Sequence, residues 1–428
     1  MMLKSESTQI ERTAEGKLRI TIELDRTEGE SFLEKEEHLA LLLNQAGLIA
    51  TQSLLKEYDD NSPVLAPNGV RHYLKGEKKK RYESPYGPIE ILRSTYQGVR
   101  GGVQYVPLES KVGMLGVNTP RYAKQLSWKY AHMPSERVAE DLAQNHLRQV
   151  SRSHIQRVSY DVGEKLLALQ SQMQYRHGIA PSLVKNISVG RDGAMLRLKD
   201  GGYREAMVGT ISLVGAERQV LHTIYLGDGP EYGKAGFEEL MRQEIALLKG
   251  EFGHLPWVGL ADGSVHNWAF LNQYTSVQII DYWHCFQYIR AGLEAIYPQE
   301  RKLNKQIDKW HDRLKEKQYS VLEVLKIFKK HRKILRKQQI VNEALEKGIT
   351  YLSNHHQQMN YAKYLSEGYL IGSGVTESAC KTLIKNRFCG CGMKWEEENT
   401  RTLTLIRGLV LTTNRWQQAW QHMSKVAA

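Results

Sequence analysis

Three acidic residues in the second half of the chain have the type and spacing expected for metal-dependent phosphoryl transfer. Asp192 lies in an apolar segment, Asp262 directly follows another, and Glu377 opens a segment with helical periodicity. Two-metal phosphoryl transfer needs carboxylates that converge on divalent ions about 3.5–4 Å apart, which serve the attacking and the leaving oxygen. Mg²⁺ (or Mn²⁺) suits such a site because it prefers oxygen ligands and binds substrate phosphates. We therefore expect these three residues to be catalytic and to be the metal ligands.

Each of the three acids also has a structural explanation. Asp192 stands beside a glycine and could be a turn residue, Asp262 could cap the next helix, and Glu377 could belong to a capping arrangement. Asp200 and Asp228 lie in glycine-rich segments and are better explained by turn geometry. Should the first strand be misregistered, Asp200 would replace Asp192 as the ligand.

The segment 371–388, IGSGVTESACKTLIKNRF, combines a turn with a helix. Its two glycines allow the backbone to turn tightly, and Ser373 or Thr376 can cap the helix that follows. The helix carries cations on the side opposite its apolar stripe, one to three turns after Glu377. This pattern suits an acid that holds a metal beside a phosphate backbone, although an ordinary capped helix with a solvated basic face is the alternative. The cations expected to contact DNA are Lys381, Lys385 and Arg387.

Asp281 and His284 form a D-x-x-H pair directly after an apolar run. The imidazole could orient a scissile phosphate or brace the metal site, and it could equally satisfy a buried hydrogen bond. We expect both residues to support the site rather than to bind the metal directly.

The four cysteines lie at 285, 380, 389 and 391, without the pattern of a disulfide scaffold. The C-x-C spacing of the last two is too close for a structural zinc site that lacks two further ligands. We expect no zinc and an intracellular location.

The elements around the acids have a distinctive order. Alternating apolar residues and glycine-rich turns predict three antiparallel strands, followed by helix, strand, helix and strand. Asp262 then ends the fourth strand, at the strand end where the sites of open α/β sheets collect. We expect an α/β protein with a mixed five-stranded sheet. The predicted segments are strands at 185–198, 203–215 and 216–227, a helix at 233–253, a strand at 257–263, a helix at 266–274 and a strand at 276–283.

Residues 286–366 are predicted to be almost entirely helical and strongly basic. Between 301 and 350 there are 15 Lys or Arg residues against 6 Asp or Glu. Such a block is usually a solvated helical face. The segment 290–366, between the fifth strand and Glu377, is therefore predicted to be all-α.

Residues 119–180 have the pattern of a helix-turn-helix. Two helical segments are separated by a short break, and the second opens with small polar and basic residues that can meet phosphates and base edges. An ordinary helical hairpin is the alternative. The residues expected to bind DNA are Arg152, Ser153, His154, Gln156 and Arg157.

The N-terminal part carries no recognisable chemistry. Residues 1–75 are predicted as a mainly helical region: a short extended piece, an amphipathic helix near 31–59, and a loop with Pro63 and Pro67 that ends it. The cluster KGEKKKR at 75–81 is interpreted as a solvated linker. The segment 82–108 indicates strands, so 76–118 is predicted to be a small β-hairpin region.

The composition is that of a globular, basic protein. The chain has 428 residues, and Lys plus Arg outnumber Asp plus Glu by 59 to 47, a formal charge of +12. This excess favours a polyanionic partner such as double-stranded DNA. No apolar segment follows the N-terminal charges and none is long enough to span a membrane, so we expect neither a secretory signal nor a membrane partner.

Three motifs carry a family resemblance: GLADGS at 259–264, DYWHCFQYI at 281–289 and GSGVTESACK at 372–381. Together they resemble the transposases of ISKra-type bacterial insertion sequences, a family similar to the wider group of DDE transposases. The resemblance runs from about Tyr82 to the C-terminus and is weak before it. It implies a ribonuclease-H-like catalytic core at 181–289 and 367–428, interrupted by the all-α insertion.

The resemblance also bears on individual positions. The pair Asp281 and His284 resembles the C/D-x-x-H signature of several DDE groups. The family usually shows a plainer apolar-Asp-Gly at the first acid, so Asp192 departs slightly from its pattern. Relatives often carry zinc-ribbon cysteines near 82–108, where this chain has none, so a hairpin there forms without metal.

The resemblance implies a DNA transposase, and the intact acids agree with that activity. It would bind the terminal inverted repeats of its element, cut the ends with Mg²⁺ and join a 3′-hydroxyl to target DNA, as a homo-oligomer on DNA in the bacterial nucleoid. Two alternatives remain: a non-catalytic DNA-binding regulator derived from such an enzyme, and a ribonuclease-H-like nuclease without strand transfer.

Overall fold

The computed structural model describes residues 8–23, 31–59, 64–65, 69, 71–230 and 234–427. It divides into two compact units, Met1–Gln174 with Trp416–Ala428, and Tyr175–Arg415. The prediction that 416–428 completes the catalytic core is therefore wrong. The helix at this end, α16 (Arg415–Ala427), is held in the first unit through its tryptophans, and the Trp420 ring lies 5.9 Å from the Lys124 ammonium.

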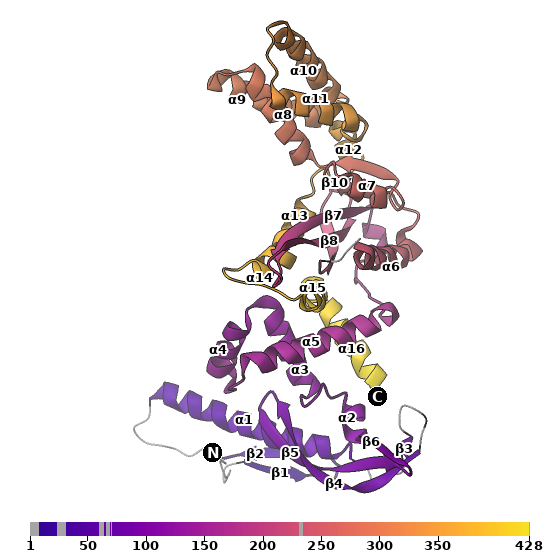
Figure 1. Ribbon diagram of the computed structural model, residues 1–428. Helices are drawn as coiled ribbons and strands as arrows, with labels where there is room; N and C mark the ends of the chain where they lie inside the picture. The colour runs from indigo at the N-terminus through magenta and orange to yellow at the C-terminus, as the bar shows by residue number, and fades with distance from the viewer. Residues whose placement is uncertain are drawn as a thin grey trace. The chain divides into compact units, whose positions relative to one another are not determined.

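The first unit contains two small antiparallel sheets and a long helix (Figure 1). The helix expected near 31–59 is confirmed, and it begins with a capping box between Ser31 and Glu34. The run KGEKKKR is part of β4 and pairs with β5, so its interpretation as a linker is wrong. The predicted loop with Pro63 and Pro67 lies outside the described residues. The elements are β1 (Thr8–Arg12), β2 (Leu18–Ile22), α1 (Phe32–Lys56), β3 (Val64–Leu65), β4 (Arg71–Ser84), β5 (Gly87–Gly98) and β6 (Gly101–Tyr105).

Four further helices complete the part of the first unit that precedes residue 170. Leu126, Val138 and Ile155, one from each of the last three helices, are fully buried, and this packing holds the three helices together. Both helices of the expected helix-turn-helix are present, with Leu147 in the left-handed conformation where the first one ends. The helices are α2 (Pro107–Val112), α3 (Pro120–His132), α4 (Ser135–His146) and α5 (Arg152–Leu169).

The second unit is built on a mixed five-stranded sheet with the order β11-β10-β7-β8-β9. Strands β7, β8 and β9 follow one another along the chain and pair in an antiparallel manner. Strand β10 pairs in parallel with both β7 and β11. The predicted order of elements and the α/β class are confirmed. The strands and the helices between them are β7 (Asn186–Arg197), β8 (Tyr203–Val214), β9 (Val220–Asp228), α6 (Ala235–Phe252), β10 (Trp257–Ala261), α7 (Val265–Leu271) and β11 (Val277–Ile280).

Successive residues of β7 point to opposite faces of this sheet. Arg191 lies on the face covered by α6 and α7, where it pairs with Glu238 at 2.8 Å and its guanidinium lies 5.1 Å from the Phe270 ring. Gly190 and Asp192 lie on the other face, which the late helices cover. Because of this alternation, the adjacent residues Arg191 and Asp192 contact different helices on opposite faces of the sheet.

The late helices approach the second face closely because glycines line it. A Cβ on Gly190 would collide with the Thr376 hydroxyl, and a Cβ on Gly227 would lie 2.6 Å from Leu383. The Thr376 hydroxyl instead forms a 2.7 Å hydrogen bond with the Thr210 hydroxyl of β8. The late elements are α13 (Gly374–Ala379), the π-helical turn η5 (Cys380–Lys385), α14 (Asn386–Phe388) and α15 (Glu397–Leu411).

Between β11 and α13 the chain forms a group of helices that shares one continuous apolar core with the sheet. This is the all-α insertion expected at 290–366, although its first helix already begins at Tyr282 (Figure 1). Among the described residues, no helix is both long enough and apolar enough to cross a membrane. The helices are α8 (Tyr282–Ile296), α9 (Glu300–Glu316), α10 (Ser320–Lys337), α11 (Glu343–His355) and α12 (Tyr361–Ser366).

The contact between β7 and α13 leads to a prediction about stability. Gly190→Ala should lower the free energy of unfolding of the second unit by about 1–3 kcal/mol, because the added methyl group must displace Thr376. Gly250→Ala is the matched control: it lies in α6 with open space around it, and alanine favours a helix by about 1 kcal/mol over glycine. Urea unfolding measures both. Equal stability of Gly190→Ala and the wild type would contradict the close packing.

Candidate functional site

Asp192 lies in the middle of β7, opposite Val208 of β8, so it is a strand residue and not a turn residue. Its Oδ1 accepts a hydrogen bond from the Gly193 N–H at 2.8 Å, and the Cys380 thiol donates to its Oδ2 at 3.4 Å. Burial raises the pKa of the Asp192 carboxyl, and the negative charge of Asp262 adds to this rise. A carboxyl whose pKa is raised by burial and by a second acid is a candidate functional group.

Asp262 follows β10 directly, at the end where the chain leaves the sheet for α7. Its Oδ1 accepts hydrogen bonds from the Ser264 N–H at 3.0 Å and from the Asn267 amide at 3.1 Å, while its carbonyl accepts from the Trp268 indole at 2.7 Å. These bonds to α7 fix the orientation of the loop. Asp262 therefore bonds to the start of α7 without capping it, because Ser264 occupies the N-cap position and makes no side-chain cap bond.

Glu377 lies in the first turn of α13. Its backbone N–H donates to the Ser373 carbonyl at 2.9 Å, and the Ser373 hydroxyl donates to its Oε1 at 2.9 Å. Ser373 therefore orients the carboxylate. The sequence suggested that its side chain caps the helix, but the side chain forms no such bond. Thr376 does not cap it either, because its hydroxyl is bonded to β8. The Glu377 side chain remains about half exposed.

Asp281 is fully buried and joins two parts of the site. Its Oδ1 accepts the His284 N–H at 2.7 Å, which caps α8, and its Oδ2 accepts the Ser373 N–H at 2.5 Å. The Tyr282 N–H also donates to the Ile371 carbonyl at 2.9 Å. Asp281 thus ties the start of α8 to the turn that precedes Glu377.

The donor atoms of Asp281, His284 and Glu377 all lie within 4.8 Å of one another, and His284 Nε2 is 3.9 Å from Glu377 Oε1. Among the residues that the structure describes, Asp192 and Asp262 do not join a metal-ligand group of this closeness. Asp192 is linked to this group in two other ways: Cys380, one turn after Glu377, contacts Asp192, and the His284 imidazole counteracts the raised pKa of Asp192. Asp262 is connected through Asp192, whose pKa its charge raises. The five predicted residues are therefore connected by contacts and by charge, and Asp281 acts through hydrogen bonds.

The other two acids have structural roles. Asp200 accepts the Gly202 N–H within the β7–β8 turn and pairs with Arg204 at 2.6 Å, in an exposed position. Asp228 ends β9 rather than lying in a turn, and it pairs with Arg401 at 3.2 Å. Asp200 is therefore not a substitute for Asp192.

Helix α11 of the insertion contacts the loop of Asp262. A Cβ on Gly263 would lie 2.7 Å from the Tyr351 ring and 3.2 Å from His355 Nε2. Burial raises the pKa of the Tyr351 hydroxyl. Sequence periodicity could not reveal this contact because nothing in a helix pattern states where the insertion docks. Cys380 could have been found, since it lies three residues after Glu377 on one helical face.

The predicted DNA-contacting cations on the late helix divide into two groups. Lys381 and Lys385 are exposed, as a DNA contact requires. Arg387 is buried, with its guanidinium 5.0 Å from the Trp395 ring, so the prediction that it contacts DNA is wrong. Arg387 instead packs against Trp395, in the segment that follows the helix.

The residues expected to bind DNA through α5 differ in the same way. Arg152, Ser153 and Arg157 are exposed, and Arg152 lies 3.8 Å from Glu136 of α4. His154 bonds to the Asn118 side chain at 2.8 Å, and burial followed by the charge of Arg157 lowers the pKa of His154. Gln156 donates to the Ser135 hydroxyl at 3.2 Å. Gln156 therefore joins α5 to α4, and His154 joins α5 to the segment before α3, while the exposed three remain the DNA-contact prediction.

The sequence matches no protein-family model and no curated protein. The functional interpretation therefore depends on the residues of the site and their geometry.

The surroundings of Asp192 predict how stability depends on pH. Asp192→Asn should raise the free energy of unfolding at pH 7 in EDTA, because it removes a buried charge whose carboxyl has a raised pKa. The gain should shrink as the pH falls through that pKa, since the wild-type carboxyl then also becomes neutral. Asp200→Asn, in the exposed turn, should show no gain. Unfolding curves at several pH values measure this, and a pH-independent difference would contradict it.

The two hydrogen bonds of Asp281 predict a structural cost. Asp281→Ala leaves two N–H groups without their acceptor and should lower the free energy of unfolding by roughly 2–4 kcal/mol. Asp281→Asn should lower the free energy of unfolding by less, because the amide oxygen still accepts one of the two hydrogen bonds. The other is lost, since the amide NH₂ then faces an N–H donor. Asp308→Ala, at an exposed position of α9, is the control. If Asp281→Ala proves as stable as that control, Asp281 does not tie α8 to the turn.

Proposed function

We propose that the protein is a DNA transposase with a ribonuclease-H-like core, which cuts the ends of a bacterial insertion sequence and joins them to target DNA. The observation that carries the proposal is the placement of three acids on adjacent elements. Asp192 lies in the central strand β7, Asp262 directly follows the neighbouring strand β10, and Glu377 lies on the helix packed against β7 and β8. The strand order, with three antiparallel strands followed by two parallel ones, supports the ribonuclease-H-like assignment.

The donor set fits Mg²⁺ or Mn²⁺. Asp192, Asp262 and Glu377 offer carboxylate oxygens, which these ions prefer, and each carboxylate is oriented by hydrogen bonds from neighbouring residues. The repulsion between Asp192 and Asp262 is of the kind that a divalent cation relieves. When bound, the ions would activate the attacking oxygen and stabilise the leaving one.

The reaction consists of two phosphoryl transfers. In the first, water attacks a phosphodiester at the end of the element, the bond between phosphorus and the 3′-oxygen breaks, and a 3′-hydroxyl and a 5′-phosphate result. In the second, this 3′-hydroxyl attacks a phosphodiester of the target and displaces its 3′-oxygen. In this proposal His284, beside Glu377, orients the phosphate, and the exposed Lys381 and Lys385 bind the flanking backbone.

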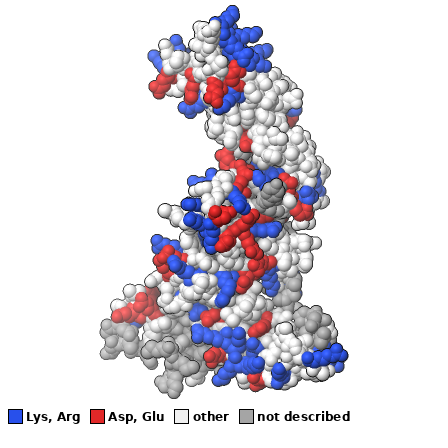
Figure 2. Space-filling view, in the orientation of Figure 1, with Lys and Arg blue, Asp and Glu red and all other residues white. Residues whose placement is uncertain are grey.

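Further cations support a DNA partner. On α10, exposed lysines recur at a spacing of four, three and four residues, which places them on one stripe of the helix. In Figure 2 Lys and Arg side chains gather over the upper end of the insertion. Such a stripe suits a phosphate backbone because each neutralised phosphate releases counterions. The residues of the stripe are Lys326, Lys330, Lys333 and Lys337.

The proposal is tested with Asp262→Asn and Glu377→Gln, which keep the side-chain shape but remove the charge. The substrate is DNA that carries the inverted repeats flanking the gene. Each variant should reduce its cleavage more than the loss of a supporting residue does, which is typically roughly 10–100-fold. Binding of that DNA should persist, and EDTA should abolish cleavage by the wild type. Asp308→Asn, exposed on α9, is the control and should cleave normally.

The outcomes separate the three functions. Binding of the repeats without cleavage by the wild type would favour the regulator. Cleavage that yields no joined product would favour the nuclease. Full activity of both variants, or undiminished cleavage in EDTA, would contradict the metal site.

A further inference from the structure

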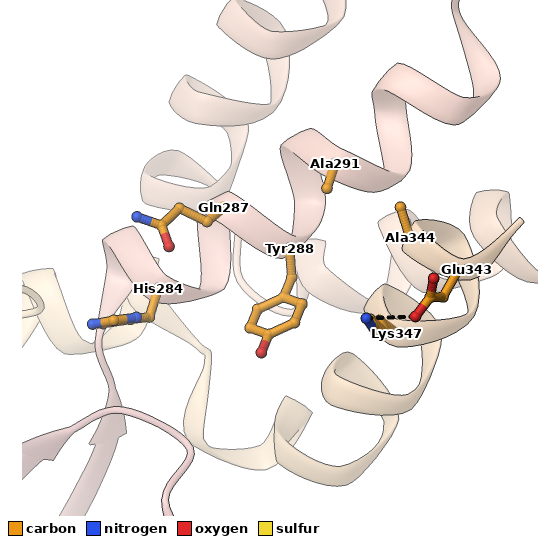
Figure 3. Close-up of a pocket in the computed structure, with 7 residues that line it drawn as sticks. All are labelled: His284, Gln287, Tyr288, Ala291, Glu343, Ala344 and Lys347. Atoms are coloured by element: carbon orange, nitrogen blue, oxygen red, sulfur yellow. Dashed lines mark ion pairs between the residues drawn. The ribbon is translucent and has the colours of Figure 1, made fainter.

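A cavity of about 380 Å³ lies between α8 and α11, immediately beside the site. Its walls come from one stripe of α8 and the first turns of α11, and Ala291 and Ala344 face each other across it (Figure 3). These small side chains leave the space that larger ones would fill. Its volume is within the range of pockets that bind small organic groups. The lining residues are His284, Gln287, Tyr288, Ala291, Glu343, Ala344 and Lys347.

The cavity is joined to the catalytic residues on two sides. His284 lines it and also lies 3.9 Å from Glu377. Tyr288 lines it and stacks on Tyr351, with ring centroids 3.9 Å apart, and the Tyr351 ring is the one that packs against Gly263 beside Asp262. A group bound in the cavity would therefore contact His284, which lies beside Glu377, and Tyr288, which packs on Tyr351.

The chemistry of the lining favours a flat, partly polar ring. Tyr288 offers an aromatic surface, the two alanines offer methyl groups, and Gln287 offers an amide that can both donate and accept. A bare phosphate is disfavoured because the one lysine, Lys347, is already paired with Glu343 at 2.7 Å. An unpaired nucleobase combines a stacking face with a hydrogen-bonding edge, and enzymes that act on DNA can unstack single bases into such pockets.

We propose that this cavity binds the base of a nucleotide next to the phosphate that is cut. The inference rests on the proposed function, since only a nucleic-acid substrate at Glu377 places a base there. The base stacks on the ring of Tyr288, and its edge bonds to Gln287. Binding there would hold the DNA strand in register with the acids and couple the insertion to the reaction.

The test measures mononucleotide binding, which does not require catalysis. Deoxyadenosine monophosphate is titrated in EDTA against the full-length protein, and binding is followed by saturation-transfer NMR. We expect a dissociation constant on the order of 1–10 mM, because only one base is stacked. Deoxyribose 5-phosphate, which lacks the base, should not bind measurably. Equal binding of the two compounds would show that the phosphate alone is recognised and would overturn the proposal.

Two variants fill the cavity, and a third is their control. Ala344→Trp should weaken binding by about tenfold or more, as expected when base stacking is lost. Ala291→Leu, a smaller change, should weaken it in the same direction and keeps the test decisive if the tryptophan variant does not fold. Thr350→Trp, at an exposed position on α11, should bind like the wild type. Unchanged binding in a folded cavity variant, or no binding by the wild type, would overturn the proposal.

Cleavage assays on the same proteins separate this inference from the function on which it rests. Mg²⁺-dependent cleavage together with unchanged nucleotide binding in both cavity variants would retain the transposase and overturn the base site. Cavity-dependent nucleotide binding without any cleavage of DNA would retain the base site and overturn the proposed enzyme.

Discussion

The close packing of α13 on the sheet is the constraint on which the site depends. Gly190 leaves room for Thr376 to reach β8, and the hydrogen bond between Thr376 and Thr210 holds the helix at that distance. Glu377 is the next residue in the same turn of α13, so this packing also fixes the position of its carboxylate. A larger residue at 190 would move the helix and with it the carboxylate. The absence of a side chain at Gly190 therefore sets the separation of Asp192 and Glu377, which are 185 residues apart in the sequence.

The insertion is part of the site and not an appendage. Its first helix begins at the cap formed by Asp281, which also binds the turn before Glu377. Its later helix α11 packs Tyr351 against Gly263, beside Asp262. Helices α8 and α11 of the insertion thus restrain two of the acids, and the continuous apolar core beneath them makes the sheet and the insertion one folded body. A movement of the insertion would alter the geometry of the acids directly.

The sequence predicted those parts of the structure that are determined by local pattern. Alternation and turn residues gave the five strands in order, including the hairpin that closes at Asp200, and the apolar run before Asp262 placed it at a strand end. The basic strand β4 was missed because its lysines resemble a solvated linker. Only its pairing with the apolar β5 identifies it as a strand. Arg387 was misplaced because the π-helical turn at Cys380–Lys385 adds a residue to one turn. That addition rotates the residues that follow by about 100° relative to an uninterrupted helix, so a side chain expected outside lies inside.

The proposed enzyme requires that Asp192, Asp262 and Glu377 together hold divalent ions. The most direct measurement is the anomalous diffraction signal of Mn²⁺ in crystals of the full-length protein. We expect manganese coordinated by all three carboxylates, as a pair of ions about 3.5–4 Å apart when DNA is present. Manganese coordinated by Asp281, His284 and Glu377, with Asp192 and Asp262 uninvolved, would contradict the account.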